Sequence, residues 1–270
     1  MAKIRLDQRV FDLGLTESRE RARTSVMAGL VYVNGQKETK PGAQVSPEAR
    51  VELRGEAIPY VSRGGLKLAK AIQVFPLAVE SAVCVDCGAS TGGFTDVLLK
   101  NGAAKVYAVD VGYGQLAWSL RQDPRVVCME RTNIRYVDHQ AIPEEIDLAV
   151  ADLSFISLRL VLGAIHGLLK DHGQAVCLVK PQFEAGKDKV GKKGVVRDPE
   201  VHREVLEEFL RYSAEAGFGL RGLDYSPIRG PEGNIEYLAW LEKNGESIAA
   251  VDLAALVEAS HLAHRKDDDQ

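Results

Sequence analysis

Long apolar runs are absent from this sequence of 270 residues, and their absence excludes several classes of protein. No stretch approaches the roughly 18 consecutive apolar residues that a membrane-spanning helix needs. The first ten residues, MAKIRLDQRV, also lack the apolar core of a secretory signal peptide. Together these features predict a cytoplasmic protein that has no membrane partner.

Cysteine is scarce as well, with four residues in the chain. Cys84 and Cys87 form one CxxC pair, which would suit half a zinc site or a redox pair. Cys128 and Cys177 stand alone and supply no second pair. We therefore expect small cysteines buried in strands and no metal site.

A surplus of positive charge is also missing, because the net charge is −4. Spread evenly, this charge would disfavour a nucleic-acid partner. Through Tyr60, however, there are ten Lys and Arg against eight Asp and Glu, so this segment carries +2 and the remainder −6. The basic segment leaves room for an RNA-binding face.

Residues 1–58 have the pattern of a compact α+β domain. A short helix in RLDQRVFDLG is expected to end at Gly14, and a second, in TESRERARTSVMAG, to begin at a Thr16 or Ser18 cap. A strand then runs through LVYV into Asn34-Gly35, which is a strong signal for a tight hairpin turn.

The pattern RLD…L…G…SRERA…GLVYVNG resembles the S4-type RNA-binding domain along nearly the whole of this segment. On charge alone, the arginines of the second helix would form a solvated face with Glu17 and Glu20 as partners. The resemblance implies instead that they contact RNA, with Asn34 and Gly35 shaping the adjoining hairpin. The implied RNA-binding residues are Arg5, Arg19, Arg21 and Arg23.

From Ala82 onward, short β-branched runs alternate with helical stretches, which is typical of parallel strands covered on both faces. The sequence predicts an α/β domain at 66–246 with a doubly wound, mostly parallel sheet of about seven strands. A linker at 59–65 precedes it, and a C-terminal helix and tail at 247–270 follow. The clearest predicted helices are LRLVLGAIHGLLKDHG and DPEVHREVLEEFLRYSAEAG, the second capped by Asp198.

The first strand of this sheet ends in DCGASTGGFT, a glycine loop that can approach a ligand closely, and the next helix is expected to start at Thr95 or Asp96. It matches neither the GxGxxG dinucleotide fingerprint nor a phosphate loop. The second strand ends in Asp110, where a carboxylate can accept both hydroxyls of a ribose. A plain strand–turn–helix that merely needs glycine is the alternative. Asp86, the loop and Asp110 together look like the S-adenosylmethionine site of class I methyltransferases, with their Rossmann-like fold.

Charged residues are expected at three further strand ends. Asp152 ends the fourth strand, Lys180 ends the fifth, and Glu236 lies on the last. With Lys67, which periodicity would not have selected, they resemble the Lys–Asp–Lys–Glu tetrad of FtsJ/RrmJ-type ribose 2′-O-methyltransferases.

The whole chain resembles the TlyA (hemolysin A) family of rRNA methyltransferases over about residues 3–242. The motifs YVSRGGLKL, DCGASTGGFTD, DLSFISL, LVKPQFE and GNIEY carry this resemblance. It implies methyl transfer from S-adenosylmethionine to a cytidine ribose in 16S rRNA, 23S rRNA or both. The implied cofactor-binding residues are Asp86, Gly88, Ser90, Thr91, Gly92, Gly93, Phe94, Asp110, Val111, Asn133 and Asp152.

The residue types suit this chemistry, because a ribose hydroxyl must lose its proton as the new bond forms. A lysine can accept a proton only if burial or a nearby cation depresses its pKa. We predict Lys180 as base or oxyanion partner, Asp152 as its orienting carboxylate, and Lys67 and Glu236 as positioning residues.

A lysine-rich loop follows Lys180 and would hold RNA phosphates, unless it is simply solvated. Its basic residues are Lys187, Lys189, Lys192, Lys193 and Arg197. Phe183 would either stack on the target base or be buried.

Other functions suit parts of the sequence. An RNA-binding assembly factor that has lost its activity would retain both domains, but no member of the tetrad is missing. A membrane-lytic protein conflicts with the absent apolar segment. A pseudouridine synthase shares the first domain and would need no glycine cofactor loop.

Overall fold

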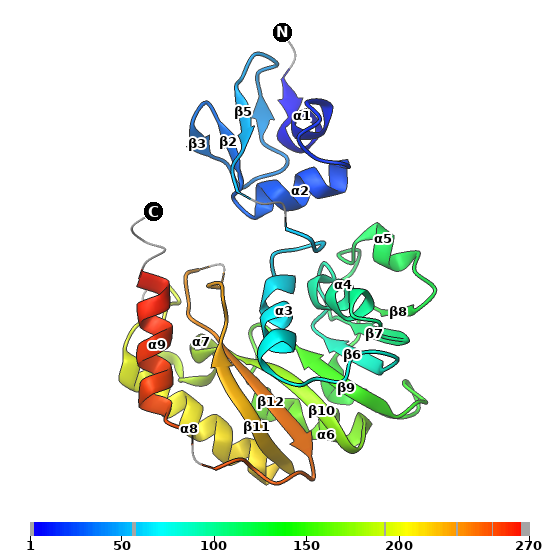
Figure 1. Ribbon diagram of the computed structural model, residues 1–270, viewed down its shortest axis with the longest axis vertical. Coiled ribbons are helices and arrows are strands. Elements are labelled where there is room, and N and C mark those ends of the chain that lie inside the picture. The colour runs from blue at the N-terminus through cyan, green and yellow to red at the C-terminus, as the bar shows by residue number, and fades with distance from the viewer. Residues whose placement is uncertain (1–2, 56–57, 192, 231, 250, 266–270) are drawn as a thin grey trace. The chain divides into compact units, whose positions relative to one another are not determined.

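The structure is a computed structural model that describes residues 3–55, 58–191, 193–230, 232–249 and 251–265 (Figure 1). The chain divides into two compact units, residues 1–65 and 66–270. Each unit has its own buried apolar core.

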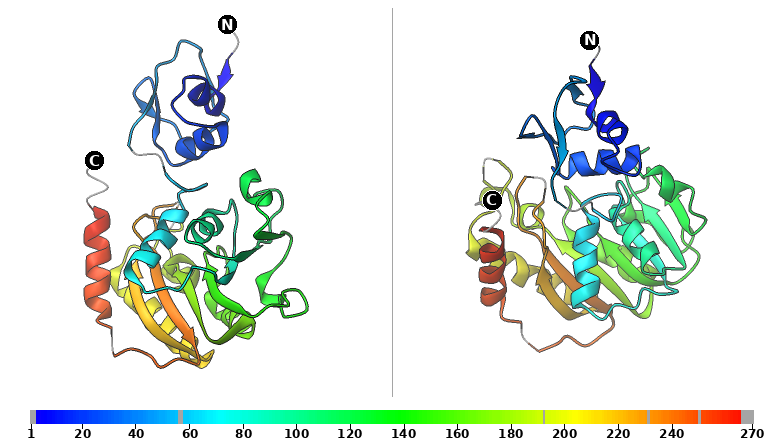
Figure 2. Two further views of the ribbon diagram at one scale, coloured as in Figure 1. Left: turned by 45° about the vertical axis from the view of Figure 1, so that its right-hand side comes forward. Right: turned by 45° about the horizontal axis from the view of Figure 1, so that its top comes forward.

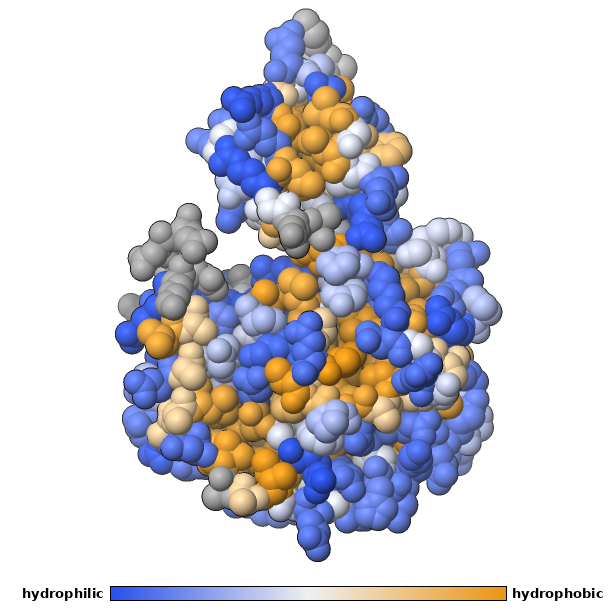
Figure 3. All heavy atoms as spheres, in the orientation of Figure 1, coloured by the Kyte–Doolittle hydropathy of each residue, from blue (hydrophilic) through white to orange (hydrophobic). Residues whose placement is uncertain are grey.

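In its described residues, the first unit combines two helices with short strands. Leu6, Val10, Ala22, Val26 and Val31 are fully buried at its centre. Its elements are β1 (Ile4–Arg5), α1 (Leu6–Asp12), α2 (Arg19–Met27), β2 (Val31–Val33), β3 (Gln36–Lys37), β4 (Gln44–Val45) and β5 (Val51–Leu53). On the face shown in Figure 3, apolar residues occupy the middle of this unit and hydrophilic residues border them.

Local signals in the first unit are confirmed. The Ser18 hydroxyl accepts a hydrogen bond from the Arg21 amide and caps α2. Asn34 and Gly35 both have positive φ, at 51° and 82°, as the tight turn between β2 and β3 requires.

The second unit is built on a seven-stranded sheet among the described residues, in the order β11-β12-β10-β9-β6-β7-β8. β12 is antiparallel to both neighbours, and the other strands run parallel to one another. The strands are β6 (Val83–Cys87), β7 (Lys105–Val109), β8 (Val126–Met129), β9 (Ile146–Ala151), β10 (Leu169–Val179), β11 (Phe218–Tyr225) and β12 (Tyr237–Lys243).

Helices cover both faces of this sheet (Figures 1 and 2). α6, α8 and α9 pack with alternate strand residues such as Val85 and Tyr237, whereas α3 and α4 cover the opposite face. The helices are α3 (Gly65–Val74), α4 (Gly93–Lys100), α5 (Trp118–Arg121), α6 (Leu162–Leu168), α7 (Pro181–Glu184), α8 (Pro199–Glu215) and α9 (Leu253–Arg265). The 3₁₀ segments among the described residues are η1 (Ile134–Tyr136), η2 (Leu158–Leu160) and η3 (Lys187–Lys189).

The strand order reverses between β6 and β9, where neighbouring strands lead in opposite directions across the sheet. Ligands of such sheets bind beyond the carboxyl ends of the strands at this point. Because β12 is antiparallel, the residue before its first position, Glu236, lies at the same edge as Asp152 and Lys180.

Three local predictions are wrong. The helix expected through Gly173 ends at Leu168, because Leu169 pairs with Ile146 on β9 and begins β10. α4 begins at Gly93, ahead of the expected Thr95 or Asp96. Cys128 is exposed on the edge strand β8, whereas the other cysteines are buried.

Candidate active site

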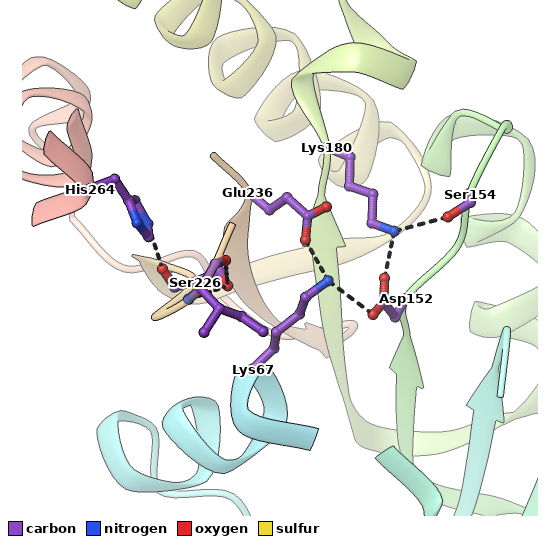
Figure 4. Close-up of polar contacts among 8 residues, drawn as sticks. Lys67, Asp152, Ser154, Lys180, Ser226, Glu236 and His264 are labelled. Carbon is purple, nitrogen blue, oxygen red and sulfur yellow. Dashed lines mark hydrogen bonds and ion pairs between the residues drawn. The ribbon is translucent and has the colours of Figure 1, made fainter. Parts of the chain in front are cut away.

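Two lysines and two carboxylates meet at the carboxyl edge of the sheet (Figure 4). Lys67 Nζ, from the first turn of α3, lies 2.6 Å from Glu236 Oε2 and 3.2 Å from Asp152 Oδ2. Lys180 Nζ lies 2.6 Å from the other Asp152 oxygen, Oδ1, and donates to Ser154 Oγ at 3.2 Å. The four residues predicted as a catalytic tetrad are therefore brought together.

This cluster is held largely away from solvent. Lys67 and Lys180 are each 6% exposed, and Glu236 is fully buried. Burial by itself acts most strongly on Lys67 and lowers its pKa, but Asp152 and Glu236 outweigh it and raise the pKa above 10.5. Lys67 is consequently a cation held between two carboxylates, as its predicted positioning role requires.

The charge of Asp152 follows from the same contacts. Burial raises the pKa of its carboxyl, but Lys67 and Lys180 together lower it below the ordinary 3.8. Asp152 is therefore an anion at neutral pH, and it holds each lysine through a separate oxygen.

The glycine loop after β6 forms one wall of an adjoining cavity. Gly88 has φ 87°, and a Cβ at this position would lie 2.9 Å from the backbone oxygen of Asp152. Only glycine suits both the conformation and the close approach. Across the loop, the Asp110 carboxylate accepts hydrogen bonds from the amides of Ser90 at 2.7 Å and Gly112 at 2.6 Å.

The cavity measures about 420 Å³, within the usual range for small-molecule sites. Six of the residues predicted to bind a cofactor line it: Gly88, Ser90, Asp110, Val111, Asn133 and Asp152. The other five do not belong to its lining: Asp86, Thr91, Gly92, Gly93 and Phe94. Asp152 belongs to both the cavity and the tetrad, so the two sites are continuous.

Asp86 lies inside β6, fully buried behind the loop. Its Oδ2 accepts from the amide and hydroxyl of Thr95, at 2.9 and 2.7 Å, and thereby ties the strand to α4. Burial raises the pKa of Asp86 to about 7, although the Thr95 bonds act in the opposite direction.

Several lining residues were not found from the sequence. Gln115, Thr132 and Ser154 line the cavity from loops after β7, β8 and β9, and they carry no periodic signal. Their position just after predicted strands is the signal that could have selected them.

Phe155 was missed as well. Its side chain is 91% exposed and its φ is 64°, which is unusual for a bulky residue. Its ring lies 5.3 Å from that of the partly buried Phe183, and both border an open cavity of about 500 Å³ beside the tetrad's loops.

The predicted arginines of the first unit divide into two groups. Arg5 and Arg19, each about half exposed, both bind the buried carboxylate of Asp7, at 3.0 and 3.3 Å. Arg21 donates to the Ile58 carbonyl at 2.7 Å, and Arg23 is exposed. Arg19 thus pairs with Asp7 rather than with the Glu17 or Glu20 of the solvated-face alternative.

The basic loop after α7 begins with η3. Lys187, Lys189, Lys193 and Arg197 are exposed, and Lys189 forms an ion pair with Glu204 on α8. Lys192 lies outside the described residues.

Strand order, cavity and charged cluster define the class of the second unit as a doubly wound α/β methyltransferase. Residues 60–243 match the FtsJ-like methyltransferase family, and residues 4–51 match the S4 domain. No helix among the described residues is both long and apolar enough to span a membrane.

Similar proteins cover nearly the whole chain. The 16S/23S rRNA (cytidine-2′-O)-methyltransferase TlyA of Mycobacterium tuberculosis is 45% identical over 97% of both chains. Hemolysin A of Brachyspira hyodysenteriae is 43% identical over 87% of this chain and 98% of its own. A solved Streptococcus thermophilus protein described as a hemolysin is 48% identical, covers 100% of both chains and superposes with a TM-score of 0.81. The chain belongs to the TlyA (hemolysin A) family of FtsJ-like methyltransferases with an S4 domain.

Proposed function

We propose that this protein transfers a methyl group from S-adenosylmethionine to the ribose 2′-hydroxyl of cytidine in 16S rRNA, 23S rRNA or both. The observation that carries the proposal is the buried Lys67–Asp152–Lys180–Glu236 cluster, which adjoins the cavity at the reversal point of the sheet. The family and the substrate in the name of the Mycobacterium tuberculosis relative support it.

The cavity residues suit the cofactor. A carboxylate offers about four acceptor positions, so Asp110 can hold ribose hydroxyls while it retains its two amide donors. Val111 and Ile134 supply apolar surface for the adenine, and Gly88 permits close approach. When bound, S-adenosylmethionine supplies an electrophilic methyl group on a positively charged sulfur.

The tetrad residues act on the attacking hydroxyl. The 2′-hydroxyl must give up its proton as its oxygen takes the methyl group. We assign Lys180 to this oxygen, either as the base that accepts the proton or as a cation beside the oxygen while solvent accepts it. Asp152 orients the Lys180 amine from 2.6 Å. Lys67 remains a cation between Asp152 and Glu236, so it positions both carboxylates rather than accepting the proton. Alignment of the hydroxyl with the methyl group contributes a large part of the acceleration.

RNA would be held by exposed basic groups on both units. Lys187 and Lys193 would contact phosphates beside the tetrad, and Arg19 and Arg23 would do so on the S4 domain. The exposed ring of Phe155, backed by Phe183, would stack on the target base. Because ribosomes are its substrate, we place the protein in the cytoplasm.

Labelled S-adenosylmethionine and isolated 30S and 50S particles test this function. We expect label in the RNA of at least one particle, and none above background with Lys180→Ala. Binding of the cofactor without methyl transfer to either particle would refute the proposed substrate. Absence of cofactor binding would favour an inactive RNA-binding assembly factor.

A further inference from the structure

The base of the lysine-rich loop is fastened to the segment that carries Glu236. The buried side chain of Asn234 donates through Nδ2 to the Gly194 carbonyl at 2.9 Å and accepts at Oδ1 from the Val196 amide at 3.0 Å. Asn234 is 2% exposed, so these are two bonds between an enclosed amide and the backbone of the loop.

His202 on α8 adds a third bond to the same segment. Its Nε2 lies 3.0 Å from the Val196 carbonyl, and its Nδ1 lies 2.7 Å from the Tyr237 hydroxyl. A carbonyl only accepts, so Nε2 carries the hydrogen, and Nδ1 accepts from Tyr237. Burial lowers the pKa of His202, which keeps the ring neutral and this pattern in place.

These contacts are made by residues on either side of Glu236 in the sequence. Asn234 precedes it by two residues and Tyr237 follows it, and both connect to residues 194–196, directly or through His202. Glu236 itself binds Lys67 at 2.6 Å. If residues 194–196 at the base of the loop move, the backbone around Glu236 therefore moves with them, and the Glu236–Lys67 ion pair shifts.

We propose that Asn234, supported by His202, is a positioning residue that transmits RNA engagement at the lysine-rich loop to Glu236 and Lys67. Lys193 is adjacent in sequence to Gly194, whose carbonyl accepts a hydrogen bond from Asn234. A phosphate bound by Lys193 therefore acts directly on the segment that Asn234 holds. This inference rests on the proposed function. Beyond that function, we infer that RNA binding at the loop orders the four residues of the tetrad in addition to increasing the affinity for RNA.

Asn234→Ala tests the proposal in the full-length protein. We expect kcat on ribosomal particles to fall by about tenfold to a hundredfold, since small misplacements in an active site cost this much. The KM for the particle and the cofactor affinity should change less than about threefold. Asn101→Ala is the matched control, because it also removes a side-chain donor to a backbone carbonyl, that of Val97, and should leave kcat unchanged. A rise in KM alone would overturn the proposal.

Two His202 variants separate the bond from general packing. His202→Gln retains an N–H near the position of Nε2, whereas His202→Asn retains only a group near Nδ1. We expect kcat to be higher for His202→Gln than for His202→Asn. Urea titration should show that both variants are folded. Equal kcat values in the two variants would contradict a role for the Val196 bond.

Coupling is measured by combining Lys193→Ala with Asn234→Ala. If Asn234 transmits the contact, Lys193→Ala lowers kcat in the parent and has no further effect in the Asn234→Ala background. If instead the fold-loss of kcat in the double variant is the product of the losses in the two single variants, the two residues act independently and the proposal is overturned.

A parent protein that methylates neither particle refutes the proposed function separately. Amide exchange around Glu236, measured with and without poly-cytidylate RNA, then tests the coupling on its own. We expect RNA to protect this peptide in the parent and not in Asn234→Ala, and equal protection in both would overturn the inference.

Discussion

Lys67 and Lys180 bind opposite oxygens of the same carboxylate, that of Asp152. Asp152 thereby holds the two amines near each other. Among the described residues, Glu236 pairs with Lys67 and not with Lys180, so the two lysines differ in their surroundings. Lys67 lies between two carboxylates, whereas Lys180 contacts the Asp152 carboxylate and the Ser154 hydroxyl. From this asymmetry we propose that Lys67 is a positioning residue and that Lys180 acts on the reacting hydroxyl.

Lys67→Met should lower the methyl-transfer rate by about a hundredfold or more, because it removes the cation that holds Asp152 and Glu236. Lys67 lowers the Asp152 pKa, so its loss raises this pKa, and the acid-side decline in activity should move to higher pH. A pH–rate profile from pH 5 to 9 measures both effects. Lys70→Met, which breaks an ion pair with Asp224 one turn away, should leave both nearly unchanged. If the acid-side decline in activity stays at the same pH in Lys67→Met, the positioning role of Lys67 is contradicted.

Asp86→Asn should change how stability depends on pH. The folded-state pKa is raised from 3.8 to about 7, so between these values the folded chain holds a proton that the unfolded chain has lost. Stability from this group is therefore complete below about pH 4 and declines as pH rises toward 7, by about 1.4 kcal/mol per pH unit. Urea unfolding of parent and variant from pH 4 to 8 should show this decline only in the parent. Parallel curves would refute it.

Gly88→Ala should weaken cofactor binding by about tenfold to a hundredfold, since the new Cβ would lie 2.9 Å from the Asp152 carbonyl oxygen. Gly114→Ala introduces the same positive-φ strain, at 71°, but its Cβ meets nothing within 4 Å. Titration calorimetry with S-adenosylmethionine compares them. Equal losses of affinity would mean that backbone strain, rather than the close approach at the cavity wall, is responsible.

Removing Lys187 and Lys193 together should weaken particle binding mainly at low salt. Each lost contact with a single-stranded phosphate should reduce the slope of log K against log salt by about 0.7. Lys170→Ala, at the start of β10 and paired with Asp147, is a control that should not alter the slope. A slope unchanged in the double variant would show that the loop is solvated rather than bound to RNA.

The residues that the sequence located well are those at the ends of strands. Asp110, Asp152 and Lys180 follow β7, β9 and β10, because buried parallel strands are marked by their apolar runs. Lys67 was selected by family resemblance alone, and its place beside Asp152 depends on the packing of α3 on the sheet, which local pattern does not encode.

Where prediction failed, contacts distant in sequence decide the structure. Leu169 continues an apparent helix, yet pairing with Ile146 makes it a strand residue. Cys128 has the apolar neighbours of a buried strand, but β8 is an edge strand and leaves it exposed. Asn234 and His202 carry no motif that predicts their shared attachment to residues 194–196.

The most direct test of the account is the chemical identity of the methylated product. Ribosomal particles treated with the protein and labelled S-adenosylmethionine would be digested to nucleosides and separated by mass. We predict label in 2′-O-methylcytidine alone, and none with Lys180→Ala. Label on a base, or on the ribose of another nucleoside, would contradict the proposed reaction.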